Sequence, residues 1–306
     1  MRSLRLPAFV VACFMATVAN AQNAGFDTAR IEQLTGAKGQ MNAKEGVFKV
    51  TLPRADLKVS ALGVKLNPAM GLSCWAAFKK MGDHTMMMGD QCLTEDQVSP
   101  VMSTALENGL EVTALHNHFA GDSPRVMFMH IGGSGDEAKL ATAVGKVFET
   151  IKQTAAAKSM MPQADIDASK SRVDGKRISQ ILGANGEDNK GVYKVTIGRT
   201  TKMHGQDMGA AMGVNTWAAF AGSDDKAVVD GDFAMTEHEL QAVLKALRGH
   251  HINVVAIHNH MTTEDPRIVF LHYWGIGPTE QLAGGLKAAL DAQQEAGRSA
   301  PVGKAH

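Results

Sequence analysis

Hydrophobic and polar residues along the second half of the chain predict a compact series of helices and strands. Alternation over 192–197 has the period of a strand with one buried face, and further strands are expected at 216–221, 227–233, 252–261 and 268–274. Asp174 can cap a short helix, and apolar residues recur at helical spacing over 240–247 and 282–290. The order is α-β-β-β-α-β-β-α. Short turns between most strands favour a mainly antiparallel sheet in an α+β fold.

The same pattern occurs twice. The segment MGLSCWAAF at 70–78 returns 142 residues later as MGVNTWAAF, and the same offset relates Gly89-Asp90 to Gly231-Asp232. We therefore expect two tandem α+β repeats, at 22–151 and 174–294, separated by a linker at 152–173 and followed by a tail at 295–306.

The first residues have the pattern of a secretory signal. Arg2 and Arg5 precede an apolar stretch at 6–18, and Ala19-Asn20-Ala21 has small residues where a signal peptidase cleaves. This predicts a signal peptide at 1–21 and a soluble mature protein, periplasmic or secreted, without a transmembrane segment. The alternative is a lipid anchor at Cys13, which the short apolar stretch before it disfavours.

Composition limits the partners that we expect. Formal net charge is zero and the sequence pI is near 7.2, so the basic footprint of a nucleic-acid binder is absent. A small molecule or a metal ion remains as the expected partner, and the oligomeric state stays open.

Four motifs carry a resemblance to a known family. They are Gly-Val-Tyr-Lys-Val at 191–195, the repeated Trp-Ala-Ala-Phe, Leu-His-Asn-His at 115–118, and Pro-Arg-Val-Met-Phe-Met-His at 124–130. With these motifs the chain resembles the LppY/LpqO family of exported bacterial proteins, a domain of unknown function. The resemblance implies export and these repeat boundaries, and it implies no reaction.

Two sets of three histidines are the main candidates for chemistry. Residues two apart on a strand point to the same face, and the following strand can return a third histidine beside them. Three imidazoles with an open position are typical of a zinc or copper site. The alternative is that the histidines are structural. The predicted metal ligands are His116, His118 and His130 in the first repeat and His258, His260 and His272 in the second.

The loop after each His-Asn-His motif adds a carboxylate and an arginine. Asp122 and Glu264 could act as a general base in a metal-dependent hydrolase, and Arg125 and Arg267 could hold an anionic group. We expect the second repeat to have the better site, because Asp265 accompanies Glu264.

Methionines and cysteines suggest two further features. Met86 and Met87 align with Val228 and Val229, which favours core packing over a copper site built on thioethers. Cys74 and Cys92 are the two cysteines left after the signal, and both lie in the first repeat. An oxidising compartment would favour a disulfide between them.

The sequence therefore favours an exported two-repeat protein that binds a divalent metal or a small ligand through its histidine strands. Two alternatives stay open, a metal-dependent hydrolase and a non-catalytic envelope protein with structural histidines.

Overall fold

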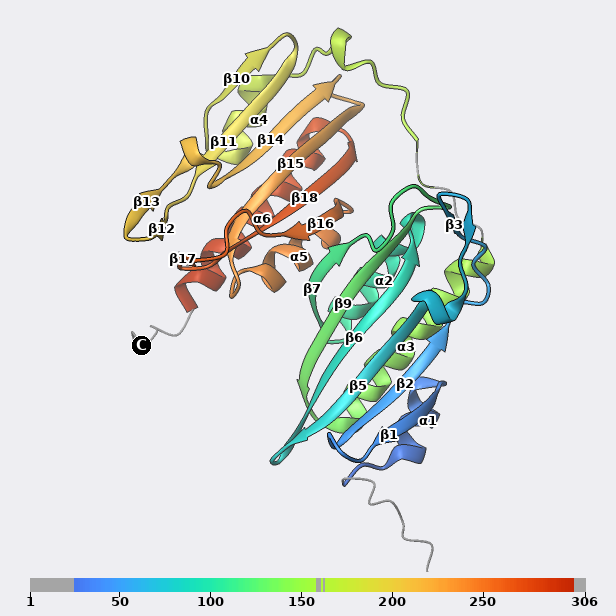
Figure 1. Ribbon diagram of the computed structural model, residues 1–306. Helices are drawn as coiled ribbons and strands as arrows, with labels where there is room; N and C mark the ends of the chain where they lie inside the picture. The colour runs from blue at the N-terminus through green and yellow to red at the C-terminus, as the bar shows by residue number, and fades with distance from the viewer. Residues whose placement is uncertain (1–24, 158–160, 162, 300–306) are drawn as a thin grey trace, which may run out of the picture.

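A computed structural model describes residues 25–157, 161 and 163–299 (Figure 1). The predicted signal peptide and the alternative anchor at Cys13 lie outside the described residues.

Twelve helices and strands build the first repeat. In chain order they are α1 (Thr28–Thr35), β1 (Lys38–Asn42), β2 (Val47–Pro53), β3 (Ser60–Ala61), β4 (Val64–Lys65), β5 (Ser73–Met81), β6 (His84–Thr94), α2 (Glu95–Glu107), β7 (Glu111–His116), β8 (Asp122–Ser123), β9 (Val126–Gly135) and α3 (Glu137–Ala157).

The second repeat has the same order. Its elements are α4 (Gly175–Leu182), β10 (Gly186–Asn189), β11 (Val192–Gly198), β12 (Thr201–Met203), β13 (Gln206–Met208), β14 (Asn215–Gly222), β15 (Ala227–Thr236), α5 (Leu240–Gly249), β16 (Asn253–His258), β17 (Glu264–Asp265), β18 (Ile268–Gly277) and α6 (Thr279–Ser299).

One antiparallel sheet runs through both repeats, in the order β1-β2-β5-β6-β9-β7-β16-β18-β15-β14-β11-β10. Each repeat supplies six neighbouring strands, and two three-stranded sheets, β4-β3-β8 and β13-β12-β17, lie beside the large one. Helices cover one face of each half (Figure 1). This architecture confirms the predicted α+β fold with mainly antiparallel strands.

Alternation along the central strands separates a core face from an open face. Ala76 and Phe78 of β5 are fully buried beneath the helices, whereas Trp75, next to Ala76, lies on the open face beneath the ammonium group of Lys49. In α3, the apolar positions Val144 and Val147 are likewise fully buried. Burial of this side of the sheet is the main stabilising contribution to each repeat.

Several elements differ from the expected pattern. The edge strand β10 was not predicted, since its residues Gly-Glu-Asp-Asn show no apolar alternation and pair only with β11. The strand expected at 252–261 ends at His258. Helix α3 continues to Ala157, within the predicted linker, and α6 continues to Ser299, within the predicted tail.

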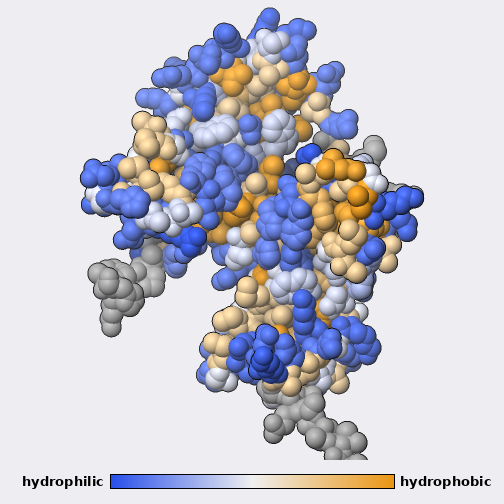
Figure 2. Space-filling model, in the orientation of Figure 1, coloured by the Kyte–Doolittle hydropathy of each residue, from blue (hydrophilic) through white to orange (hydrophobic). Residues whose placement is uncertain are grey.

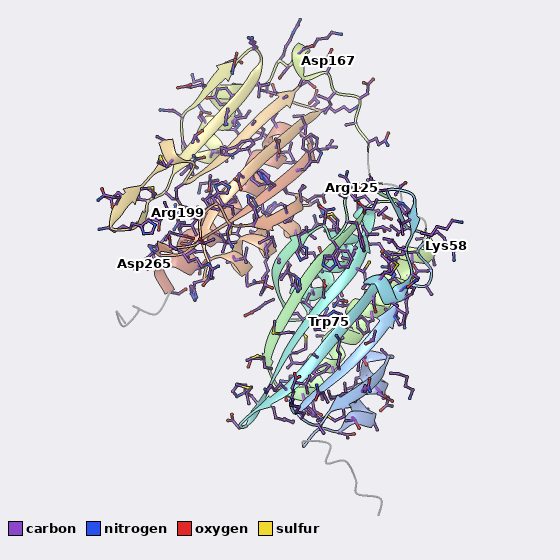
Figure 3. All side chains as sticks on the ribbon, in the orientation of Figure 1. Lys58, Trp75, Arg125, Asp167, Arg199 and Asp265 are labelled. Carbon is purple, nitrogen blue, oxygen red and sulfur yellow. The ribbon has the colours of Figure 1, made fainter. Side chains whose placement is uncertain are left out.

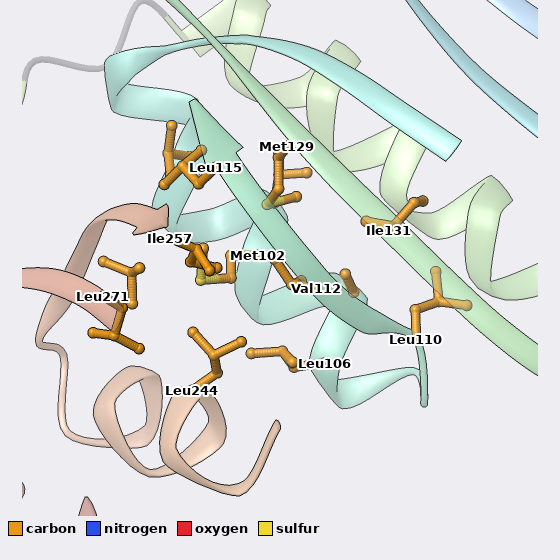
Figure 4. Packing of buried hydrophobic residues seen from close by; sticks show 14 of the residues in the cluster. Met102, Leu106, Leu110, Val112, Leu115, Met129, Ile131, Leu244, Ile257 and Leu271 are labelled. Atoms are coloured by element: carbon orange, nitrogen blue, oxygen red, sulfur yellow. The ribbon is translucent and has the colours of Figure 1, made fainter. Parts of the chain in front are cut away.

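The two repeats meet where β7 and β16 lie side by side. Leu115 and Ile257 pair across this seam, among the packed apolar side chains of Figure 4. The Gln241 side chain donates to the Val112 carbonyl at 2.9 Å and accepts from the Val112 amide at 3.0 Å. Figure 2 shows hydrophobic surface at this junction. These contacts join the repeats into one continuous sheet.

Candidate metal centre

Strand pairing brings His258 and His272 together on the open face of the sheet. Asp232 of β15 lies directly opposite His272 of β18, and His272 in turn lies opposite Ala256 of β16. His258 follows two residues after Ala256, opposite Phe270. The small side chain of Ala256 leaves room for the imidazole rings above it.

A bulge in β16 decides which face the histidines occupy. Val254 pairs with Tyr273, whose side chain is buried, but the register shifts before Ala256, which pairs with His272. Without that extra residue, His258 would share the buried face of Tyr273. The first repeat has the same irregularity between Val112 and Ala114.

The three second-repeat histidines are in close contact. The rings of His258 and His272 are stacked with centroids 4.8 Å apart, and those of His258 and His260 are 5.1 Å apart. The Nε2 atoms of His258 and His260 are 3.2 Å apart. His260 also stacks on Phe270 at 3.5 Å, which holds its ring over the end of the strand.

Asp232 completes the cluster, although the sequence pattern did not predict it as a ligand. Its Oδ2 atom lies 3.5 Å from Nε2 of His260, and the residue is 3% exposed. Its Oδ1 atom is buried with no hydrogen-bond partner among the residues that the structure describes. The repeated Gly-Asp at 89–90 and 231–232 was the available sequence signal. A buried carboxylate oxygen without a partner is costly unless a cation satisfies it.

The spacing of these atoms approaches that of a metal site. Ligand atoms of Asp232, His258 and His272 all lie within 4.8 Å of one another. Ligands ~2.0–2.1 Å from a shared tetrahedral ion are ~3.3 Å apart, so a modest closure would bring the three around one ion. His260 already meets that spacing with respect to His258.

The surroundings of His258 favour its neutral form. Burial, together with the neighbouring His272 and His260, lowers the pKa of His258 to about 4. Burial also raises the pKa of Asp232, although His272 and His260 act in the opposite direction. At neutral pH His258 therefore has the unprotonated form that a metal requires.

The first repeat has the same constellation with a looser geometry. His116 lies 5.2 Å from His118 and 5.1 Å from His130, measured between ring centroids. Nε2 of His118 is 4.0 Å from Oδ2 of Asp90, which is longer than the matching 3.5 Å contact in the second repeat. Within the described part of the chain, the second repeat alone has three ligand atoms as close together as 4.8 Å.

The loop carboxylates hold backbone groups. Oδ2 of Asp122 accepts from the Val126 amide at 2.8 Å, and Oε1 of Glu264 accepts from the Ile268 amide at 3.2 Å. Both bonds tie the loop to the first residue of the returning strand. This matched arrangement accounts for an acidic residue at both positions without catalysis.

The loop arginines pair with carboxylates at or just before the next helix, Glu95 at the start of α2 and Glu237 in the turn before α5. Arg125 lies 3.8 Å from Glu95, and Arg267 lies 3.5 Å from Glu237. Figure 3 places Arg125 at the end of the first-repeat sheet nearest the second repeat, where it lines a cavity of 300 Å³ together with His116 and Trp274.

The predicted disulfide is not formed in the structure. Cys74 and Cys92 are buried free thiols, with Cys74 Sγ 3.5 Å from the Cys92 carbonyl oxygen. Cys74 alternates with Ala76 on the core face, whereas Cys92 lies opposite Phe128, on which His118 stacks from the open face. Neighbouring strands do not imply a bridge when the side chains leave opposite faces.

Fold and site together define a class, a tandem-repeat α+β protein with a His/Asp cluster on the open face of each half-sheet. Comparison of the sequence with known families gives the particular assignment. Residues 29–150 and 176–292 each match the family described as Domain of Unknown Function (DUF1259), and the chain belongs to that family. The tandem arrangement is thereby confirmed, while the finer LppY/LpqO resemblance stays a prediction.

No curated protein and no solved structure matches the chain. Among the described residues, no helix has both the length and the apolar character needed to cross a membrane.

Proposed function

We propose that the protein binds one divalent metal ion in its second repeat, with Asp232, His258 and His272 as ligands and His260 as a fourth. The observation that carries this proposal is the buried Oδ1 atom of Asp232, which has no partner among the described residues while three imidazoles surround the carboxylate. A set of nitrogen and carboxylate donors suits zinc or copper(II).

Calorimetric titration of metal-stripped protein, purified without a histidine tag, tests the proposal. We expect one zinc ion per chain in the wild type and loss of binding in the Asp232→Asn/His258→Ala double variant. The matched control is Asp90→Asn/His116→Ala, which changes the equivalent residues of the first repeat and should keep the second-repeat ion.

Two results would overturn the proposal. If stripped wild-type protein takes up no zinc or copper(II), the histidines are structural. If the double variant binds as the wild type does, the ion lies elsewhere. Circular dichroism of each variant establishes that the fold is retained.

We also propose that the site operates outside the cytoplasm, after removal of residues 1–21. The Arg-rich start, the apolar stretch and Ala-Asn-Ala support export. A metal site outside the cytoplasm would be exposed to whichever ions the envelope holds.

One observation favours the hydrolase alternative as a second candidate. Oε2 of Glu264 is buried and has no partner among the residues described, so the bond from the Ile268 amide to Oε1 leaves one carboxylate oxygen unused. Hydrolysis of chromogenic esters and phosphoesters, abolished by a chelator and by Glu264→Gln, would establish it. Glutamine keeps the acceptor for the Ile268 amide, so loss of turnover would not reflect loss of the loop.

A further inference from the structure

The hairpin of β5 and β6 carries a strip of sulfur and imidazole side chains on its open face. Met81 and His84 lie opposite each other beside the turn, and Met86 and Met88 follow His84 at alternate positions. All four side chains therefore leave the same face of the hairpin. We name these four residues the thioether strip.

Core packing accounts for Met87 and does not account for the strip. Met87 is 0% exposed, whereas Met81 is 41%, Met86 38% and Met88 59% exposed. The expectation that Met86 fills the core is therefore wrong, because only its neighbour Met87 is buried there. Three adjacent thioethers in solvent contribute little burial energy to the fold.

The geometry of the hairpin allows Met81, His84 and Met86 to share an ion, whereas Met88 lies four residues, ~13 Å, along the strand from His84 and cannot join them. Paired residues have Cβ atoms ~4.5–5.5 Å apart, and the flexible methionine side chain spans the remaining distance. Met86 lies between Ser134 of β9, whose side chain is small, and Lys79 of β5, which is exposed and can direct its ammonium group into solvent. The hairpin tip extends past the neighbouring strands (Figure 1).

His84 is oriented for coordination. Its Nδ1 atom lies 3.1 Å from Oδ1 of Asp83, which acts as the acceptor when Nδ1 carries the proton. The lone pair of Nε2 is then directed away from Asp83.

The second repeat lacks the strip. The positions 142 residues later hold Ser223, Lys226, Val228 and Asp230, none of which is a thioether or an imidazole. The repeated fold therefore does not require these four residues, and their presence in one copy is independent of the Asp232 cluster.

We propose that the thioether strip binds a soft monovalent cation, Cu(I), through Met81, Met86 and Nε2 of His84. Thioethers select Cu(I), whereas the nitrogen and carboxylate donors of the Asp232 cluster suit a divalent ion. The protein would then have two metal sites with different preferences.

Competition for Cu(I) with a coloured chelator, under reducing and oxygen-free conditions, tests this site. Calorimetry with Ag(I) provides a redox-inert probe. Wild-type protein should bind one ion. Met81→Leu/Met86→Leu should lower the affinity by about a hundredfold, if each lost ligand is worth roughly a factor of ten.

The controls are Met87→Leu, a change at the buried neighbour, and Met212→Leu, a change at an exposed methionine outside the strip. Both should bind within about twofold of the wild type, since a volume-conserving swap is tolerated in a core. If Met87→Leu does not fold, Met212→Leu alone serves as the control.

The proposal fails if wild-type protein binds neither ion, if the double variant binds unchanged, or if Met212→Leu weakens binding equally. Asp232→Asn/His258→Ala should keep Cu(I) binding, so the experiments test the two proposed sites independently.

Discussion

At the residue scale, His258 and Asp232 titrate away from their ordinary values in opposite directions. Burial lowers the pKa of His258 and raises that of Asp232, because both groups are removed from water beside one another. In each case burial disfavours the charged form. In the metal-free protein at neutral pH, a bound cation would therefore offset the free-energy cost of burying the Asp232 carboxylate.

The lowered pKa of His258 predicts acid sensitivity of the metal-free protein. The unfolded chain takes up a proton near pH 6.5, but the folded protein does so only near pH 4. This group therefore leaves the free energy of unfolding unchanged above about pH 6.5 and lowers it progressively as the pH falls from about 6.5 towards about 4. Melting temperatures measured in chelator across this range should fall less steeply for His258→Gln.

The raised pKa of Asp232 has the opposite effect on stability. The folded protein binds this proton more tightly than the unfolded chain does, so Asp232 stabilises the folded state as the pH falls. His116→Gln in the first repeat is the matched control and should keep the wild-type slope. Equal slopes for wild type and His258→Gln would contradict the assignment.

The cysteines give a second prediction at this scale. Burial raises the pKa of Cys74 to about 11 and that of Cys92 to about 12, so native protein should resist alkylation at pH 8. In unfolded, unreduced protein both thiols should react. Mass spectrometry counts the labels, and zero labels would restore the disulfide that the sequence predicted.

At the element scale, β16 performs two tasks. Its bulge turns His258 onto the open face, and its outer edge meets β7 at the seam between the repeats. The hydroxyl of Ser99 in α2 donates to the Asn253 side chain at 2.7 Å. Gln241 of α5, which occupies the position equivalent to Ser99 in the other repeat, bonds the backbone of Val112. Each helix therefore holds the edge strand of the opposite repeat.

Gln241→Ala should destabilise the protein by about 2 kcal/mol, because it removes both bonds to the buried Val112 backbone. Denaturant unfolding measures the change. Gln281→Ala, at an exposed position of α6, is the control and should stay within about 0.5 kcal/mol of the wild type. A similar loss in both variants would argue against a specific role of the seam bonds.

At the scale of the whole molecule, the two repeats share a fold but differ in what they carry. The second repeat has the tighter His/Asp cluster, and the first has the thioether strip together with Cys74 and Cys92. Divergence of this kind is consistent with one copy keeping a site while the other changes.

Processing is the prediction that concerns the whole chain. Export should release a mature protein that begins at Gln22, after Ala-Asn-Ala. The intact mass of protein recovered from the envelope checks this. A mass that includes diacylglycerol on Cys13 would replace the signal-peptide prediction with a lipid anchor.

Local patterns were sufficient to predict much of this protein. The offset of 142 residues revealed the repeat, and alternation together with helical spacing located the main strands and helices. Strand parity also grouped His258 with His260, although β16 ends at His258 and His260 reaches the cluster by stacking on Phe270. These features depend on near neighbours in the sequence.

Only the tertiary structure decided how those patterns combine. Parity shows that two side chains share a face, but a bulge and the register with β18 decide which face that is. Asp232 joined the site because β15 and β18 pair, a contact that no local period contains. Likewise, the two cysteines lie on neighbouring strands as expected, but the alternation of each strand separates their thiols across the sheet.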